Sequence, residues 1–557
     1  MTFPNKSTSR RGARVVATAG VLAAGLLATM MAPAIADEAS NAPSYSEHVL
    51  AKNGDNAIDP VLGKNYRIPA LADLGGGVVL ASYDGRPDGA DSPSPNSIIQ
   101  RRSTDYGQTW GAPTYVVRGQ MPGDGVLRYG FSDPSYIVDR ETGTVFNFHV
   151  FSKDVSFQAG AFGNDDADRQ ITSVQVSVST DRGLTWSTDP ANMPVLPPSD
   201  NYPAGSGYAG FAGPSITKVV KPVGETVGSV TNVGGVAGVF AASGEGIQLK
   251  YGAHKGRLIQ QFTGKVKQLD GSTTYQAYSV YSDDHGKTWQ RGAFTGTGMD
   301  ENKTVELSNG DVMMNSRTSS GERARKVAVS KDGGESYGAV TVDATLADPV
   351  NNASIARMYP DALEGSAAAR ILLFSNANSA TARQNGTIRY SCDDGATWSA
   401  GKQFKAGAMS YSTVTALGDG NFGVFYEGDN NTMTFGKFNA AWLDTPCGVT
   451  VLVKPAFEPN VDRQKLNGQA PVDLDLKSGK YSIGDTVNIK NVPANEWAYV
   501  HLNQHGARIG WFLADADGTV TFTVPAGTKN GKDTLVVSGQ DGAVLSFGTF
   551  HVTPAFR

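Results

Sequence analysis

Cysteine and charge are both scarce in this sequence. Its 557 residues include only two cysteines, Cys392 and Cys447, so a cysteine-rich zinc or iron–sulfur site is excluded by count. Charged residues make up 18% of the chain and the net charge is −5, which provides no electrostatic footprint for nucleic acid. A disulfide between the two cysteines stays open at this point, because the sequence does not reveal their geometry.

Long apolar runs are missing after the first forty residues. The N-terminus carries basic residues, then an apolar run from Val15 to Met31 and a small-residue site at Ala34-Ile-Ala36. This order is typical of a secretory signal, so we interpret residues 1–36 as a signal peptide. A single membrane anchor is the alternative, although the run is short and interrupted by two glycines. We expect the mature chain to be secreted, without a membrane span.

What the sequence does contain is an eight-residue motif of the form Ser-x-Asp-x-Gly-x-Thr-Trp, which recurs with small variations. The five copies lie at residues 103–110, 179–186, 282–289, 330–337 and 391–398. The aspartate can accept backbone N–H bonds within a tight turn, and the glycine can adopt a positive φ. The unequal intervals between copies favour propeller blades over a solenoid of fixed period. The octets themselves indicate a β-propeller architecture and do not point to any catalytic or binding role.

The rest of the pattern predicts an all-β protein in two parts. After a polar connector at 37–47, short alternating segments from 48 to 445 predict a β-propeller, with an insertion or long hairpin at 224–238. Residues 446–557 contain at least five further strands at sandwich spacing, which predicts a small immunoglobulin-like β-sandwich. A spacer is the favoured role for this second domain, and a carbohydrate-binding module is the alternative.

An arginine inside an apolar strand points to the chemistry. In Tyr66-Arg-Ile-Pro69, a buried guanidinium would require an anionic partner. Together with the five octets, this motif resembles those of the bacterial exo-sialidases (neuraminidases), over about residues 48–442. The resemblance implies a six-bladed propeller that removes terminal α-linked sialic acids from glycoproteins, glycolipids and oligosaccharides.

The resemblance also implies an arginine clamp for the carboxylate of the substrate. Arg67, Arg317 and Arg383 match the three clamp positions, where planar guanidinium groups bind a carboxylate in a way that lysine cannot imitate. Arg86 fits a family position that contacts the carboxylate or acetamido side of the sugar. Glu427, at the end of an apolar strand, resembles the acidic residue that holds the first arginine in place.

The catalytic groups follow from the same resemblance. Tyr411 matches the family's nucleophile and Glu301 the base beside it; a tyrosine arrives neutral at a carbon that already bears a carboxylate. Asp91 matches the acid and base that protonates the leaving oxygen and later activates water. Asp133 and Asp300 are expected to line the glycerol or acetamido pockets.

The resulting hypothesis is a secreted, monomeric, retaining exo-α-sialidase that acts on sialylated glycoconjugates without a cofactor or metal. A trans-sialidase or an enzyme forming an anhydro sugar would use the same centre. A non-catalytic sialoglycan-binding propeller would lose Tyr411 or Glu301, and both are present. Calcium binding by the acidic segment 164–168 stays open.

Overall fold

The computed structural model describes most of the chain after the N-terminal segment. Described are residues 42–554 except 62, 124–126, 166, 188–217, 220, 445, 450–453, 456–457, 460–465, 467–469, 471–472, 477–479, 495 and 526. The predicted signal peptide at 1–36 and much of the connector at 37–47 lie outside these residues. Within the described part the elements are strands and short 3₁₀ turns, which confirms the all-β prediction, and it contains no helix that could cross a membrane.

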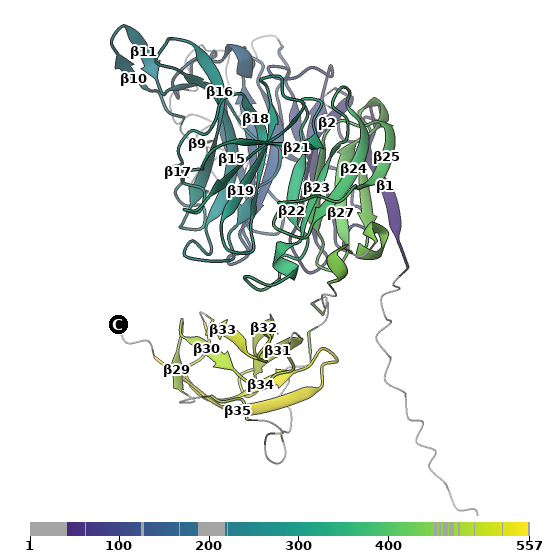
Figure 1. The fold of residues 1–557 in the computed structure, drawn as a ribbon, viewed down its shortest axis with the longest axis vertical. Helices are drawn as coiled ribbons and strands as arrows, with labels where there is room; N and C mark the ends of the chain where they lie inside the picture. Colours follow the sequence, from purple (N-terminus) through teal and green to yellow (C-terminus); the bar gives the residue numbers. More distant parts are fainter. Residues whose placement is uncertain are drawn as a thin grey trace, which may run out of the picture. The chain divides into compact units, whose positions relative to one another are not determined.

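Strands between residues 45 and 438 form mainly antiparallel sheets, in which most consecutive strands lie side by side (Figure 1). The first sheet contains β2 (Asn65–Asp73), β3 (Val79–Arg86), β4 (Ser97–Ser103) and β5 (Thr114–Val117). The second contains β6 (Gly130–Val138), β7 (Val145–Ser152), β8 (Ser173–Ser179), β9 (Lys218–Val219) and the parallel β13 (Gly244–Glu245). The third contains β12 (Val236–Ala241), β14 (Ile247–Gln248), β15 (Leu258–Lys267), β16 (Thr273–Ser282) and β17 (Gln290–Arg291).

Three more sheets follow in the same manner. The fourth contains β18 (Met299–Glu306), β19 (Val312–Thr318), β20 (Ala324–Ser330) and β21 (Thr341–Ala347). The fifth contains β22 (Ser354–Arg357), β23 (Leu372–Ala377), β24 (Gln384–Ser391) and β25 (Lys402–Ala408). The sixth contains β26 (Ser412–Ala416), β27 (Phe422–Glu427), β28 (Met433–Phe438) and β1 (Tyr45–Ala51). Because β1 pairs with β28, the first described strand completes the sheet that β26, β27 and β28 form.

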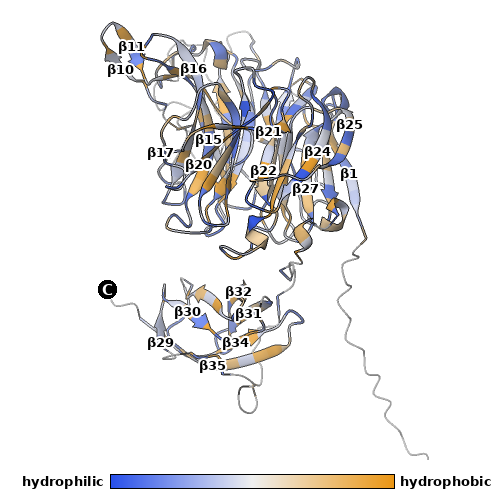
Figure 2. Ribbon diagram, viewed as in Figure 1, coloured by the Kyte–Doolittle hydropathy of each residue, from blue (hydrophilic) through white to orange (hydrophobic). Residues whose placement is uncertain are grey.

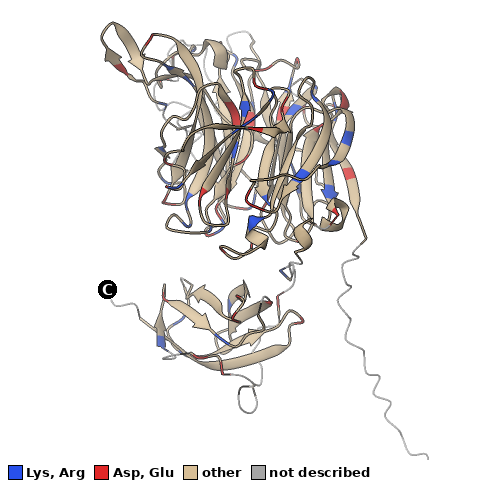
Figure 3. Ribbon diagram, in the orientation of Figure 1, with Lys and Arg blue, Asp and Glu red and all other residues tan. Residues whose placement is uncertain are grey.

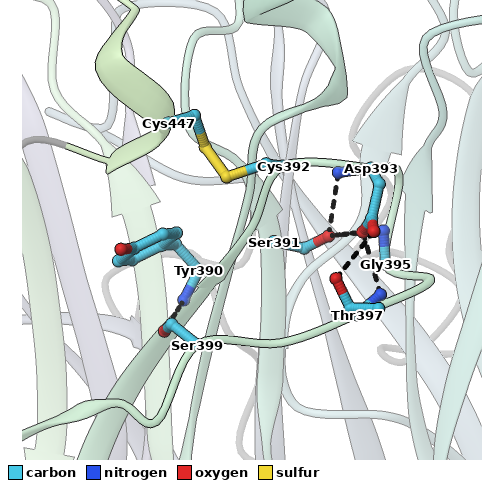
Figure 4. Close-up of a disulfide and its surroundings, with 8 residues drawn as sticks. All are labelled: Tyr390, Ser391, Cys392, Asp393, Gly395, Thr397, Ser399 and Cys447. Atoms are coloured by element: carbon cyan, nitrogen blue, oxygen red, sulfur yellow. Dashed lines mark hydrogen bonds between the residues drawn. A yellow bond between two sulfur atoms is a disulfide. The ribbon is translucent and has the colours of Figure 1, made fainter.

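Each octet connects the third strand of a sheet to the fourth. In the fifth copy, Thr397 donates from its backbone N–H and its hydroxyl to the carboxylate of Asp393, and Gly395 N–H donates to Ser391 Oγ (Figure 4). Gly395 has φ +83°, as predicted for the turn glycine. Of the two aspartates in this copy, Asp394 accepts instead from Ser308, so the turn role belongs to Asp393.

The octet glycines also pack against a neighbouring sheet. An ideal Cβ at Gly183 would lie 2.6 Å from Leu80 of the first sheet, and one at Gly286 would lie 2.3 Å from Phe146 of the second. Gly334 and Gly395 contact the third and fourth sheets in the same way, and Gly107 of the first sheet packs on the sixth. Each of the last four octets therefore lies against the sheet before its own, and the first octet lies against the sixth sheet.

The one disulfide found among the described residues joins the fifth octet to the end of this region. Cys392 and Cys447 are bonded, with 5.7 Å between their Cα atoms (Figure 4). Cys447 belongs to a 3₁₀ turn, Pro446–Gly448. The disulfide, which the sequence alone could not decide, is therefore present in the structure.

Elsewhere, residues 224–238 contain the hairpin β10 (Glu225–Val227) and β11 (Val230–Val233), as expected for an insertion. The C-terminal part holds a five-stranded and a two-stranded sheet around their own apolar core, which is lined by residues such as Val500 and Phe522. Figure 2 shows hydrophobic (orange) segments along these strands. Their strands are β29 (Lys480–Ser482), β30 (Thr486–Ile489), β31 (Trp497–Leu502), β32 (Ala507–Leu513), β33 (Val520–Thr523), β34 (Gly531–Ser538) and β35 (Val544–Thr553).

Candidate active site

The predicted site residues gather at the end of the sheets opposite the octets. In the first sheet Arg67 pairs with Asp84, whereas Ser103, which begins the first octet, pairs with Val79 at the other end of β3. Five of the six sheets thus carry, at one end, an octet turn that holds the fold. The other end carries the charged side chains of the site. Figure 3 shows that blue (Lys and Arg) and red (Asp and Glu) segments are spread over the sheets amid a largely tan ribbon.

Tyr411 and Glu301 form the centre of the site. Tyr411 immediately precedes β26, and its hydroxyl donates to Glu301 Oε1 at 2.5 Å. Arg317, near the end of β19, donates from Nη1 to Glu301 Oε2 at 2.8 Å and to the Tyr411 oxygen at 3.0 Å. Tyr411 is only 5% exposed, so these bonds lie largely out of water. A phenol, a carboxylate and a guanidinium are therefore in mutual contact.

The pKa values of this pair are pushed apart. Burial and the charge of Glu301 raise the pKa of Tyr411 well above its ordinary value. Burial acts to raise the pKa of Glu301 too, but the charge of Arg317 and the hydrogen bond from Tyr411 outweigh it and lower that pKa. In the resting site Glu301 is thus an ionised acceptor beside a neutral phenol.

Arg67 is held by a buried carboxylate from the sixth sheet. Its Nε and Nη2 donate to Glu427 Oε2 at 3.4 and 3.3 Å, and the Glu427 side chain is fully buried. Glu427 Oε1 also accepts the backbone N–H of Ile68 at 2.6 Å. Ile68 has φ +62°, a conformation that is costly for a β-branched residue and recurs at functional sites. One carboxylate therefore fixes both the guanidinium and the strained backbone next to it.

Arg383 completes a ring of cations around the tyrosine. Its guanidinium carbon lies 5.4 Å from the centre of the Tyr411 ring, and that of Arg67 lies 5.2 Å from it. Arg383 Nη2 donates to the carbonyl of Val350 at 3.3 Å. Within the described ranges no carboxylate lies within ion-pair distance of Arg383. Its charge is therefore available for an anion from solution.

Asp91 lies in the loop after β3, facing the arginines. Its Oδ1 accepts from Arg86 Nη1 at 2.5 Å and lies 3.5 Å from Arg67 Nη1, while the side chain is 75% exposed. Partial burial acts to raise the pKa of Asp91, but the charges of Arg86 and Arg67 outweigh it and hold the pKa below its ordinary value. This carboxylate is the one in the site that solvent or a leaving group reaches most readily.

Asp133 and Asp300, the two residues expected to line the pockets, differ in their surroundings. Asp300 Oδ2 lies 3.3 Å from Arg317 Nε, and burial raises the pKa of Asp300 to about 6 against that charge. Asp133 has φ +61°, and its backbone N–H donates to Asp84 Oδ1 at 3.0 Å. Burial and the charge of Asp84 raise the pKa of Asp133 well above its ordinary value. Both carboxyl groups lie within the cluster around Glu301 and Arg86.

Sequence reasoning missed what Asp84 does. This residue was assigned no role from the sequence, whereas Asp84 lies buried on β3 and binds Arg86 through Nε and Nη2 at 3.1 and 2.8 Å. A charged residue in the middle of the alternating run Val79–Arg86 was the available indication. The described residues contain no group of three or more His, Cys, Asp and Glu side chains suited to a metal.

β-Bulges in the first strands of three sheets determine the direction of several side chains of the site. The strand register shifts between Arg67 and Ala70, between Ser132 and Ser135, and between Met299 and Asn302. The extra residues at these places include Ile68, Asp133, Asp300 and Glu301. A bulge bends a strand and redirects its side chains, and bulges are common beside active sites.

Comparison with known proteins agrees with this geometry. A family model described as a BNR repeat-like domain matches residues 243–424. The chain is 45% identical over 511 residues to a sialidase of Micromonospora viridifaciens, covering 92% of this chain and 70% of the relative. It is 26% identical over 377 residues to a sialidase of Bacteroides fragilis, covering 66% of this chain and 61% of that one.

Solved structures show the same fold. A Hadza microbial sialidase matches with a TM-score of 0.53 at 23% identity, covering 68% of this chain and 66% of that chain. An intramolecular trans-sialidase from Ruminococcus gnavus, solved with oseltamivir carboxylate, matches with a TM-score of 0.52 at 20% identity, covering 71% and 98%. The propeller-type fold predicted from the octets is thereby confirmed.

Proposed function

The chain belongs to the sialidase family and is a glycoside hydrolase that releases sialic acid, and we propose that it does so with retention of configuration, through a covalent sialyl-tyrosine. The observation that carries this mechanism is the 2.5 Å hydrogen bond from Tyr411 to Glu301, enclosed by three arginines. A buried phenol bonded to an ionised carboxylate has few structural uses that would also need such a concentration of positive charge.

The arginines bind the carboxylate of the substrate. Arg67, Arg317 and Arg383 each lie next to Tyr411, through a hydrogen bond or over its ring. A sialoside carries its carboxylate on the anomeric carbon, so an anion held by these groups would present that carbon to the tyrosine oxygen. Planar guanidinium groups favour two-pronged contacts and therefore fix orientation as well as affinity.

Glu301 removes the phenolic proton as Tyr411 attacks. Free tyrosinate is rare in the resting site because the pKa of Tyr411 is raised, so proton transfer accompanies attack rather than preceding it. The two displacements, first by Tyr411 and then by water, return the original anomer. Arg317 stabilises the charge that moves between the two oxygen atoms.

Asp91 serves as the acid for the leaving group and then as the base for water. Its lowered pKa in the free site comes largely from Arg86 and Arg67. A substrate carboxylate bound to Arg67 would compete with Asp91 for that guanidinium and would thereby raise the pKa of Asp91. Binding of the substrate would in this way prepare the acid that its cleavage needs.

Two measurements test the mechanism. Proton NMR of the chain acting on a sialyl-lactose should detect the α-anomer of free sialic acid first, followed by mutarotation. The Tyr411→Phe substitution should abolish turnover while leaving sialic acid affinity within about twofold, because the arginines are untouched. Tyr426→Phe is the matched control, since this buried tyrosine also donates to a carboxylate, Glu47, at 2.6 Å. Initial β-anomer, or equal losses in both variants, would contradict the mechanism. An anhydro sugar would instead show that water is not the acceptor in the second displacement.

We also infer the finer architecture. The six successive sheets, with each octet glycine packed on the preceding sheet and the first on the sixth, support a ring of six blades at 48–445. A separate apolar core supports an immunoglobulin-like spacer domain at 446–557. Export is supported by the signal-like composition of 1–36 and by the Cys392–Cys447 disulfide, a bond that persists in oxidising compartments.

A further inference from the structure

A buried arginine with no assigned role lies behind the site. Arg325 belongs to β20, and its side chain and that of Asp348 are each 1% exposed. Arg325 Nη1 donates to Asp348 Oδ2 at 3.1 Å and to the carbonyl oxygen of Asn351 at 2.8 Å. Arg325 Nε donates to Asn315 Oδ1 at 2.7 Å. One guanidinium thus joins β19 to the segment that leads into β22.

Both ends of this connection lead to an arginine of the clamp. Asn315 lies two residues before Arg317 on β19, and its carbonyl oxygen also lies 3.4 Å from Arg325 Nη2. On the other side, Val350 precedes the anchored residue 351, and the Val350 carbonyl accepts from Arg383 at 3.3 Å. Val350 has φ +63°, a costly conformation for a β-branched residue that only a firmly held segment can maintain.

A third branch reaches the tyrosine. Asn351 is itself held by its backbone N–H, which donates to Asp348 Oδ1 at 2.8 Å. Its side-chain Nδ2 donates to the carbonyl of Ser410 at 2.6 Å, and Ser410 directly precedes Tyr411. One amide therefore ties the backbone just before Tyr411 to the segment that Arg325 holds, in addition to the backbone bonds that join Ser410 and Tyr411 to Glu427.

We propose that Arg325 is a positioning residue, which sets Tyr411 through Asn351 and sets the clamp arginines through Asn315 and the Val350 carbonyl. This inference rests on the nucleophile role proposed for Tyr411. Arginine suits the position because its planar group can bond in three directions at once, whereas a lysine ammonium is a single compact charge. A misplacement of about 1 Å at a reacting atom can reduce turnover by about a hundredfold.

Two substitutions separate the branches. Asn351→Leu removes the donor to Ser410 and leaves the Arg325–Asp348 pair in place. We expect it to lower kcat for an aryl sialoside by about ten- to a hundredfold and to leave the dissociation constant of sialic acid within about twofold. Arg325→Lys should lower kcat similarly and also weaken sialic acid binding several-fold, because the clamp loses its support.

Arg257→Lys is the matched control. Arg257 is also a buried, ion-paired arginine, bonded to Asp283 at 2.7 and 2.8 Å and to Glu335 at 3.0 Å, on the octet side. We expect it to lower the thermal unfolding midpoint and leave kcat unchanged. Wild-type kcat in folded Asn351→Leu would overturn the proposal, even if Arg325→Lys did not fold. Persisting turnover in Tyr411→Phe would instead overturn the nucleophile assignment.

Discussion

Replacing Glu301 with glutamine should remove the base and little else. The amide keeps the size of the side chain and can still contact Arg317, but it cannot take the proton of Tyr411, whose hydroxyl oxygen lies 2.5 Å from Glu301 Oε1 in the wild-type site. A positioned base typically contributes about 10²–10⁴ in rate. At about 1.36 kcal/mol per tenfold change, the Glu301→Gln barrier should rise by about 3–5 kcal/mol.

The pH profile provides a second readout of the same substitution. Because the pKa of Glu301 is lowered, the base is ionised at every pH above the ordinary carboxyl value of about 4.3. The Glu301-dependent part of wild-type kcat should therefore fall only in more acidic solution, as the carboxylate takes up a proton. The residual activity of Glu301→Gln should lack the decline at low pH that protonation of Glu301 causes in the wild type.

Asp300→Asn is the control that isolates the proton transfer. Asp300 and Glu301 both contact Arg317, at 3.3 and 2.8 Å, but of the two only Glu301 accepts from Tyr411. The assay is steady-state turnover of an aryl sialoside across pH, with sialic acid affinity measured by calorimetry. Equal losses of kcat in the two variants would refute the argument, because charge near Arg317 would then explain both.

Two stability predictions follow from the packing. Glu427→Ala should lower the free energy of unfolding by about 3–5 kcal/mol, because it leaves the charge of Arg67 without its buried partner. Chemical denaturation measures this change, and an unchanged unfolding midpoint would contradict the prediction. Gly107→Ala should destabilise by about 1–3 kcal/mol more than Gly75→Ala, since both glycines have positive φ but only a Cβ at Gly107 would meet another side chain, at 2.5 Å. Equal unfolding midpoints for Gly107→Ala and Gly75→Ala would contradict this prediction, because the neighbouring side chain would then move aside without cost.

The sequence predicted what lies close together along the chain. The turn bonds of the octets join residues at most four apart, and Arg67 was conspicuous because an arginine interrupts an apolar strand. Its partner Glu427 lies 360 residues away and was assigned through the family resemblance alone. The Cys392–Cys447 bond was undecidable for a related reason, since it requires the fifth octet to meet a turn 55 residues later.

What the sequence could not predict depends on three-dimensional neighbours. Alternation within β20 does not reveal that Arg325 meets Asp348 and Asn351 in a different segment. The register shifts also leave no mark on hydrophobic periodicity, because a bulge adds one residue to a pattern that is already irregular at strand ends. Yet the bulges decide where Asp133 and Glu301 point.

The contacts of the site cross between sheets, and this links catalysis to closure of the proposed ring of blades. Tyr411 before the sixth sheet bonds to Glu301 of the fourth, and Glu427 of the sixth bonds to Arg67 of the first. No single sheet holds both Tyr411 and its base Glu301, or both Arg67 and its buried partner Glu427. Pairing of β1 with β28 and packing of the first octet on the sixth sheet therefore matter for the chemistry, because they bring Arg67 to the side of Tyr411. The octets contribute no reacting group, but they set the distances on which the reacting groups depend.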